Sequence, residues 1–167
     1  LNRYGVACGK RAVIFGNNND AFKTARDLQG HGVEIVGYVD SRMDSELEGD
    51  FPIYKGASVT NVSGRMGIRQ LEIIEANGVQ KKINTDLLAV SGGWNPTVHL
   101  TCHMNGRPEW NEDISSFIPI PGMIPGLEVA GAAAGVFSTK GCLKSGVFRA
   151  REILKSIGIS YKSTPVP

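Results

Sequence analysis

The chain has 167 residues, which is enough for one ordinary domain or parts of two. With 18 Lys and Arg against 16 Asp and Glu, its formal net charge is only +2, too small to favour a nucleic-acid or membrane surface. Neither an apolar run of about 18 residues nor a signal-peptide pattern is present. We therefore expect neither a nucleic-acid nor a membrane partner.

The cysteines and the chain ends bear on compartment and completeness. Cys8, Cys102 and Cys142 form no C-x-x-C pair, so we interpret them as reduced thiols of a cytoplasmic protein. The chain begins within "LNRYGVACGKR" and ends in a proline-containing, linker-like composition. We expect a piece of a longer polypeptide.

Residues 11–40 predict a strand, a helix and a second strand. "RAVIFG" (11–16) is an apolar run ended by a glycine, and "VEIVGYV" (33–39) is similar. Between them, 20–30 predicts a helix, with Asp20 as its cap or first-turn acid and Gly30 as its stop. Such a unit implies parallel strands joined by a right-handed crossover.

Residues 41–93 predict mainly strands. A short helical turn is expected in the polar segment 41–50, and a third strand in "FPIYKG". An antiparallel meander is expected to follow, with Asn77-Gly78 as a hairpin turn. "TDLLAVSGG" (85–93) predicts a buried strand closed by two glycines.

After Trp94 the sequence becomes proline-rich, and 94–126 predicts mostly irregular structure with short elements. We expect a last strand running into a small-residue turn at 127–135, then a helix over 138–158 that starts at Ser138 or Thr139. The predicted fold class is α/β: a Rossmann-like three-layer dinucleotide-binding domain with an antiparallel meander, plus a partial second FAD/NAD-type lobe. The predicted parts are a linker (1–7), the first domain (8–93) and the second lobe (94–167).

The turn after the first strand half-matches the dinucleotide fingerprint G-x-G-x-x-G/A. Gly16 and Ala21 stand at its first and third positions, while Asn18 replaces the second glycine. Asp40, at the end of the second strand, is a candidate for a ribose hydroxyl, and Arg42 for a 2′-phosphate. Alternatively, Asp40 caps the next turn. A nucleotide site and a turn that only shapes the fold both remain open here.

Two other segments carry polar or small residues of interest. In "LEVAGAAAGVFSTKGCL" small residues lead into a helix N-terminus, which suits an anion but equally suits close packing. "HLTCH" places His99, Cys102 and His103 near one another without a fourth ligand, so we interpret it as a polar loop and expect no metal. Cys142 is expected to act as a small apolar residue.

Four stretches together resemble pyridine-nucleotide reductases of the glutathione-reductase type. These are "AVIFGNNNDAFKTA", "YVDSR", "TDLLAVSGGWNPTVHL" and "PGLEVAGAAAG". The resemblance implies that 8–93 is a second dinucleotide domain inserted into a first, and that 94–167 is the returning part of the first. Where that family usually has Gly-Asp, this chain has Gly131-Ala132, so the usual acid partner of a flavin is missing.

Within that family, "RYGVACGKRAVIFGNNNDAF" and "FIPIPGMIPGLEVAGAAAGVFSTKGCL" are most similar to the alpha subunits of heterotetrameric sarcosine oxidases. This resemblance implies oxidative demethylation of sarcosine to glycine, with hydrogen peroxide and a one-carbon unit passed to tetrahydrofolate on a downstream domain. It implies NAD in this subunit, with FAD and FMN elsewhere in the complex, and the other subunits as partners. The fragment itself is expected to be inactive.

The resemblance also ranks the candidate sites. It implies NAD contacts at Gly131, Ala132, Phe137 and Thr139. The opening turn, with Gly16, Asn18 and Asp40, becomes a fold-shaping relic with at most weak binding. Two alternatives remain: an NAD(P)H-binding lobe of a flavin-dependent reductase, and a non-binding module that joins subunits. Asn18→Gly distinguishes the first from a scaffold, because only a reductase lobe would gain affinity.

Overall fold

The computed structural model describes residues 1–162, and the chain divides into two compact units. We name them unit 1 (Leu1–Gly93) and unit 2 (Trp94–Pro167). Each is described by itself. Within residues 1–162, no helix combines the length and the apolar character needed to cross a membrane.

A parallel four-stranded sheet forms the centre of unit 1, in the order β3-β2-β1-β7. Its strands are β1 (Arg11–Gly16), β2 (Glu34–Asp40), β3 (Ile53–Lys55) and β7 (Leu87–Ser91), and each neighbouring pair is parallel. The predicted strand–helix–strand unit is confirmed, as is the third strand. The sheet therefore has the arrangement expected of a dinucleotide-binding domain.

The predicted meander is confirmed as a second, antiparallel sheet in the order β4-β5-β6. Its strands are β4 (Ser58–Ser63), β5 (Gln70–Ile74) and β6 (Gln80–Asn84). The Asn77-Gly78 turn joins the last two: Gly78 has φ 83°, and Asn77 Oδ1 accepts a hydrogen bond from Val79 N at 2.9 Å. This left-handed glycine is what the sequence signal requires.

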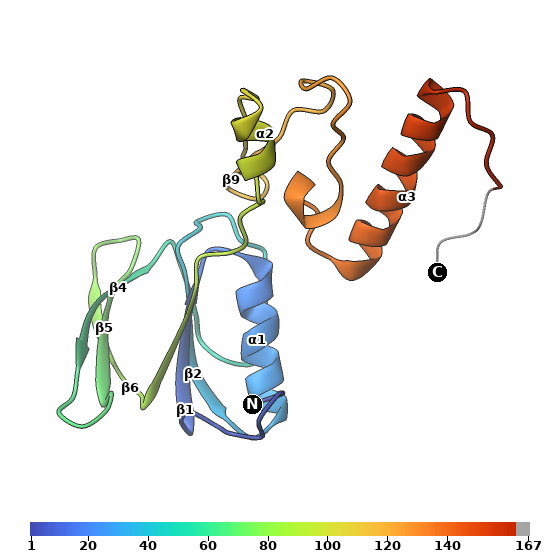
Figure 1. The fold of residues 1–167 in the computed structure, drawn as a ribbon. Coiled ribbons are helices and arrows are strands. Elements are labelled where there is room, and N and C mark those ends of the chain that lie inside the picture. The colour runs from blue at the N-terminus through green and yellow to red at the C-terminus, as the bar shows by residue number, and fades with distance from the viewer. Residues whose placement is uncertain (163–167) are drawn as a thin grey trace. The chain divides into compact units, whose positions relative to one another are not determined.

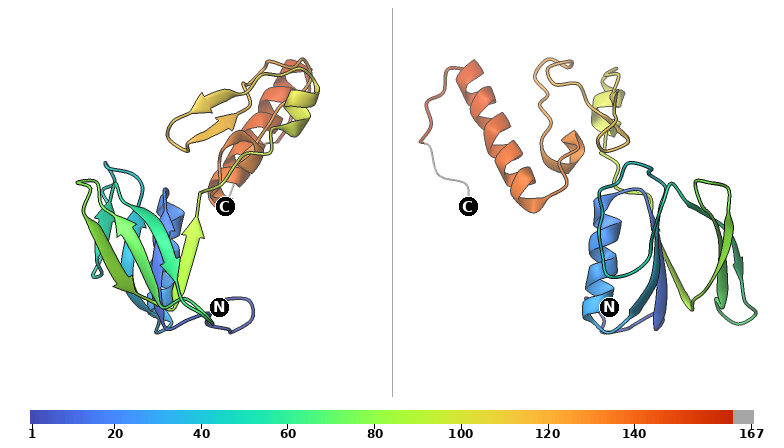
Figure 2. Two further views of the ribbon diagram at one scale, coloured as in Figure 1. Left: turned by 90° about the vertical axis from the view of Figure 1, so that its left-hand side faces the viewer. Right: turned by 180° about the vertical axis from the view of Figure 1, so that it is seen from behind.

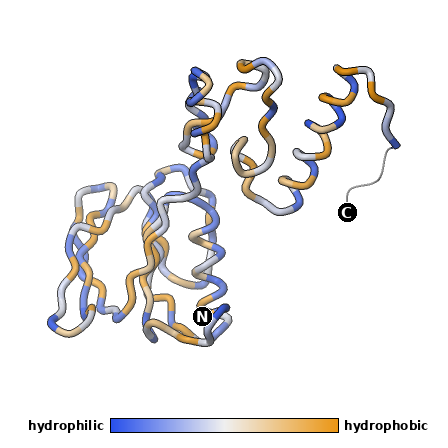
Figure 3. The backbone as a smooth tube through the Cα atoms, viewed as in Figure 1, coloured by the Kyte–Doolittle hydropathy of each residue, from blue (hydrophilic) through white to orange (hydrophobic). Residues whose placement is uncertain are grey.

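Unit 1 has three layers, because α1 (Asn19–Gly30) covers one face of the parallel sheet and the antiparallel sheet covers the other (Figures 1 and 2). Each interface has its own core. Ala12, Ile14 and Tyr38 pack against α1, while Val13 and Val39 pack against Leu71 and Ile73 of β5. Consecutive residues of β1 thus face opposite layers, which explains why the strand is apolar after its first residue, Arg11 (Figure 3).

Two predictions for unit 1 are wrong. Segment 41–50 forms bends and no helix; at its start the Asp40 side chain accepts from Arg42 N, a local bond that competes with helix formation. The predicted buried strand β7 is only half-buried, and Val90 is 67% exposed. The reason is that β7 lies at the edge of the sheet.

The start of α1 also differs in part. Asn18 is its N-cap, with Oδ1 accepting from Ala21 N at 3.0 Å. Asp20 is therefore not the cap but a first-turn acid, the second of the two roles predicted for it, and its Oδ1 lies 2.6 Å from Lys23 Nζ.

Unit 2 contains short elements followed by one long helix. They are α2 (His99–His103), β8 (Glu109–Asn111), β9 (Ser116–Ile118), the 3-10 helix η1 (Gly131–Ala134) and α3 (Thr139–Ser156), with β8 and β9 forming an antiparallel ribbon. Ser138 caps α3, as predicted. The strand predicted within 127–135 is wrong: this segment pairs with no strand, and η1 forms instead. Apolar and polar residues alternate along α3 (Figure 3), which has no buried residue in the described structure.

Candidate functional site

The first candidate site lies at the carboxyl end of the parallel sheet, where β1 turns into α1. Gly16 permits the close approach of the helix: a Cβ there would lie 2.6 Å from Ala21 Cβ and 3.3 Å from the Tyr38 hydroxyl. Ala21 is buried against the sheet. The first and third fingerprint positions therefore bring helix and strand together, as the fingerprint requires.

At the second fingerprint position, the Asn18 side chain is fully engaged within the protein. Its Oδ1 caps α1 through Ala21 N, and its Nδ2 lies 3.3 Å from both the carbonyl oxygen and the hydroxyl of Ser91. Nδ2 also donates to Asn17 Oδ1 at 3.0 Å. Asn18 thus ties the β1–α1 turn to the end of β7 and occupies an amide that could otherwise face an anion.

Asp40, the candidate ribose acid, is closed off by Arg42. Arg42 Nε lies 3.0 Å from Asp40 Oδ1 and Arg42 Nη2 lies 2.9 Å from Oδ2, a bidentate pair. The Asp40 side chain is 0% exposed and that of Arg42 is 31% exposed. Nη2 also donates to Asn19 Oδ1 at 3.0 Å, so Arg42 joins the end of β2 to the first turn of α1.

The electrostatics of this cluster follow from burial and from Arg42. Burial alone raises the pKa of Asp40, but hydrogen bonds from the Arg42 side chain and backbone outweigh it and hold that pKa below its usual value. The same side-chain bond raises the pKa of Arg42. The nearby Ser45 hydroxyl also lowers the pKa of Asp40. The geometry is too poor to count as a hydrogen bond, so the buried Ser45 Oγ has no hydrogen-bond partner within residues 1–162.

Tyr38 completes the cluster from the α1 side of the sheet. Its hydroxyl donates to the Asn18 carbonyl at 3.1 Å, and its ring packs edge-on against Phe22, with centroids 5.3 Å apart. Burial, reinforced by the Asp40 charge, raises the pKa of Tyr38 to about 12. Local sequence patterns did not identify the roles of Tyr38, Asn19 and Ser91, because these contacts join separate elements.

The second candidate segment, 131–139, connects η1 to α3. Gly131 is buried with φ 63°, its N–H donates to Ser145 Oγ at 3.2 Å, and a Cβ on it would lie 3.4 Å from Cys142 Sγ. Gly131 therefore packs against α3 rather than facing solvent. Cys142 Sγ donates to the Val136 carbonyl at 2.9 Å, which holds the same turn.

The other predicted residues of this segment are more accessible. Ala132 and Thr139 are exposed, and Phe137 is half-buried. Thr139 begins α3, whose first turn contains no acid and includes Lys140. The first turn of α1 carries Asp20 instead. Since a helix N-terminus favours negative ligands, α3 offers the more suitable end for an anion.

The histidine-containing motif forms no metal site in the described structure. His99, Cys102 and His103 all belong to the short helix α2. No cluster of three or more His, Cys, Asp or Glu suited to a metal ion occurs within residues 1–162.

Unit 2 also contains a partly open cavity of about 170 Å³ that sequence reasoning missed. Its lining includes Ile118, Ile124 and Val129, together with Ala134 of η1 and Arg149 of α3. Arg149 Nη1 lies 3.5 Å from Glu128 Oε2. The cavity walls come from segments spread over 101–149, so no local motif marks it.

The sequence relatives of the chain are sarcosine oxidase alpha subunits. It is 37% identical over 161 residues to the alpha subunit from Rhizobium meliloti (strain 1021), a match that covers 95% of this chain and 16% of that subunit. The alpha subunit from Corynebacterium sp. (strain P-1) is 29% identical over 159 residues, covering 87% and 16%. The chain thus spans about a sixth of these relatives' length. No family model matches it.

Solved structures with a similar fold include a reductase and a dehydrogenase. Thioredoxin reductase from T. acidophilum gives a TM-score of 0.66 at 19% identity, covering 90% of this chain and 53% of that one. L-proline dehydrogenase from P. horikoshii gives 0.63 at 19%, covering 96% and 29%. At these identities the likeness concerns the fold alone. By its sequence the chain belongs with one segment of the sarcosine oxidase alpha subunits, and its fold is that of the pyridine-nucleotide-disulfide oxidoreductases.

Proposed function

We propose that this chain is the part of a sarcosine-oxidase-type alpha subunit that contributes one side of a NAD site, at residues 131–139. In this proposal unit 1 is a structural module that keeps the dinucleotide fold without binding a nucleotide. The proposal is supported by the sequence relatives and by the contrast between the two helix N-termini.

The observation that carries the proposal is the closed state of the first candidate site. A nucleotide there would need a free carboxylate after β2 and free amides at the start of α1. Arg42 takes both oxygens of Asp40, and Asn18 takes the Ala21 amide. The exposed start of α3 has no acid in its first turn, unlike that of α1. Ser138 Oγ caps its Gly141 amide just as Asn18 caps the Ala21 amide, so the absence of an acid is what favours α3 for an anion.

For the complete protein we propose oxidative demethylation of sarcosine to glycine, with hydrogen peroxide formed and the one-carbon unit passed to tetrahydrofolate. The flavins FAD and FMN, the folate domain and the other subunits would lie outside this chain, in the cytoplasm of the cell. We propose no catalytic residue here. Asp40, whose carboxylate is fully buried, is held by Arg42 and is not reachable by a substrate.

The test is the NAD content of the purified complex that contains the complete alpha subunit, after acid extraction. Thr139→Glu adds a negative charge at the first residue of α3, where it does not weaken the helix but repels a pyrophosphate. Ser160→Glu, past the end of α3, adds the same charge as a matched control. We expect Thr139→Glu to lose bound NAD and Ser160→Glu to retain it.

A second arm distinguishes the two candidate sites. Asp40→Asn should leave the NAD content unchanged, because Asp40 faces Arg42 and not a ligand in the proposal. If Asp40→Asn loses NAD while Thr139→Glu retains it, the proposal is wrong and the NAD(P)H-binding lobe of a reductase becomes the better account.

A further inference from the structure

We infer that Arg42 is an internal ligand of unit 1: its guanidinium occupies the Asp40 carboxylate to which the ribose of a nucleotide would bind. In unit 1 the Arg42 side chain thus takes the position that a bound nucleotide would occupy beside Asp40. This inference deepens the structural role proposed above for unit 1 and rests on it, and it assigns a specific function to Arg42.

The geometry of the Asp40–Arg42 pair is that of a ligand contact. In dinucleotide-binding folds the acid after the second strand accepts a hydrogen bond from a ribose hydroxyl. Asp40 stands at that position, as the last residue of β2, and Gly16 at the end of β1 is its neighbour in the sheet. Arg42 Nε and Nη2 reach the two oxygens of Asp40 at 3.0 and 2.9 Å. The acceptors that a ribose would use are therefore satisfied from within the chain.

Arg42 also connects the two elements that a nucleotide would connect. A bound nucleotide bridges the acid after β2 and the start of the first helix. Arg42 makes the same bridge, because Nη2 also donates to Asn19 Oδ1, the first residue of α1, at 3.0 Å. Asn18 supplies the other half by taking the Ala21 amide. Arg42 and Asn18 therefore make, from within the chain, the two contacts that a nucleotide would make: one with the acid after β2 and one with an amide at the start of α1.

The burial of Asp40 makes its partner important for stability. Asp40 is 0% exposed, and removing the partner of a buried charge is strongly destabilising. A surface ion pair contributes little by comparison. Arg42 is 31% exposed, so its guanidinium can be reached from solvent while its partner cannot. Truncating Arg42 should therefore leave a carboxylate that a small planar cation can still approach.

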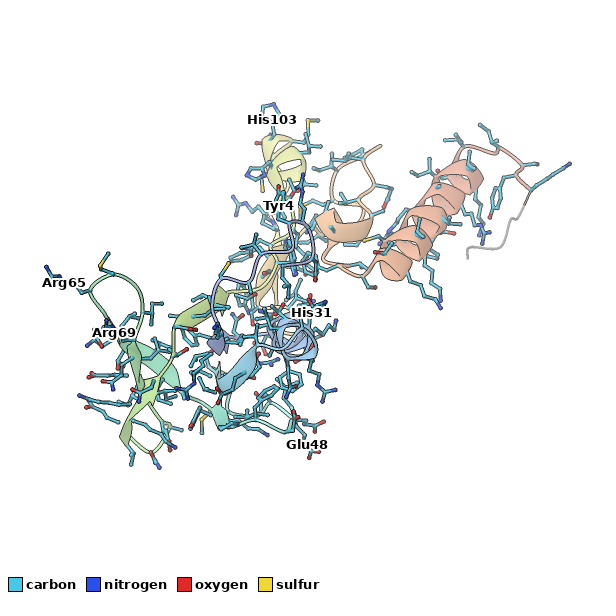
Figure 4. The ribbon with its side chains drawn as sticks, turned by 90° about the horizontal axis from the view of Figure 1, so that it is seen from below. Tyr4, His31, Glu48, Arg65, Arg69 and His103 are labelled. Atoms are coloured by element: carbon cyan, nitrogen blue, oxygen red, sulfur yellow. The ribbon has the colours of Figure 1, made fainter. Side chains whose placement is uncertain are left out.

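The experiment is chemical rescue of Arg42→Ala in the 167-residue chain. We expect the variant to lower the Tm of unit 1 by roughly 10 °C. Guanidinium chloride at about 10 mM, far below denaturing concentrations, should restore part of that loss. The same concentration of sodium chloride should not. Arg65→Ala is the matched control, because Arg65 extends into solvent from the β4–β5 loop (Figure 4), and it should show neither the loss nor the rescue.

A milder variant keeps the test interpretable if Arg42→Ala does not fold. Arg42→Lys retains the charge but cannot make the two parallel bonds, so its Tm should fall less and should still rise with guanidinium. Absence of rescue in a folded variant overturns the inference. ADP-ribose provides a separate test: if it raises the Tm of the wild-type chain through unit 1, the structural role itself is wrong. No ADP-ribose effect together with no rescue leaves the structural role intact and refutes only the internal ligand.

Discussion

Asn18 and Ser91 lie 73 positions apart, yet Asn18 Nδ2 lies 3.3 Å from both the carbonyl oxygen and the hydroxyl of Ser91. The residue that breaks the glycine fingerprint is thus the one that joins the β1–α1 turn to the end of β7. The departure from the fingerprint has a structural use in this chain.

The two functions of Asn18 can be separated by mutation. Asn18→Ser keeps a capping oxygen but removes the amide that reaches Ser91, whereas Asn18→Ala removes both. We expect Asn18→Ala to lower the free energy of unfolding by about 1 kcal/mol or more, since it loses the cap as well. Asn18→Ser should lose only the smaller part that belongs to the Ser91 link. Urea unfolding followed by far-UV circular dichroism measures both.

Asn18→Gly restores the fingerprint and tests whether that is enough to create a site. We expect no gain in affinity for NADH or NADPH, because Arg42 still occupies Asp40. Calorimetric titration of the variant measures this. A clear gain would favour the reductase-lobe alternative, in which Asn18 alone blocks the turn.

Because the pKa of Asp40 is lowered in the folded chain, we predict that the chain loses stability in acid. Its folded pKa lies below the unfolded value of about 3.9, so its contribution is fully present above that value and disappears as pH falls through the folded pKa. Asp86 contributes in the same direction, because backbone N–H groups of Arg11 and Lys10 lower its pKa. Asp40→Asn should therefore be less stable at pH 7 but lose less stability as the pH falls from about 4 to about 2.

The measurement is urea unfolding across that pH range. Glu48→Gln serves as the control, because Glu48 is an exposed acid on the same loop and its side chain extends away from the ribbon (Figure 4). If the free energy of unfolding of Asp40→Asn falls as steeply with decreasing pH as that of the wild type, the result would argue against an ion pair at Asp40.

Tyr38 predicts a separate change in alkali. Its pKa is raised to about 12, chiefly by burial, so the neutral phenol favours the folded state. That contribution is fully present below the unfolded value of about 10 and is lost as pH rises through the folded value. Ultraviolet absorbance of the phenolate should show one late-titrating component among the four tyrosines. Tyr38→Phe should remove it; a late component that persists in Tyr38→Phe belongs to another residue.

Two glycines of unit 2 should respond oppositely to alanine. Gly131 has φ 63°, where a side chain is strained, so Gly131→Ala should destabilise unit 2 by about 1–2 kcal/mol. Gly146 lies inside α3 with open space where the added methyl group would lie, so Gly146→Ala should stabilise the helix by up to about 1 kcal/mol. Tryptophan fluorescence reports on unit 2 alone, because Trp94 and Trp110 are the two tryptophans of the chain and both lie there. Equal effects of the two substitutions would contradict the strained backbone at Gly131.

Local patterns predicted those parts of the fold that depend on local structure. The strand at 11–16 has the predicted bounds, and the Asn77-Gly78 turn and the Ser138 cap form as expected. The strand predicted within 127–135 failed because a strand requires a neighbour, and the sequence of one segment does not specify it. Val90 was expected to be buried, but the position of β7 at the sheet edge is a property of the whole topology.

The candidate site was predictable to a similar extent. Gly16, Asn18 and Asp40 are indeed gathered at one end of the sheet, as the half-matched fingerprint indicated. The sequence did not reveal that Arg42 pairs with the Asp40 carboxylate and that Asn18 caps the Ala21 amide. The identity of a residue does not determine which group its side chain will contact. The same Arg42 could equally have faced a 2′-phosphate.

The most direct test of the closed state of unit 1 is hydrogen exchange of the 167-residue chain, with and without millimolar NAD, NADH or NADPH. Peptides that cover 16–21 and 40–45 report on the turn and on the Asp40–Arg42 pair. We predict that none of the three nucleotides slows exchange in these peptides. If any of the three nucleotides slows exchange in both peptides, a nucleotide binds at the site that Arg42 and Asn18 are proposed to close. That result would contradict the closed state.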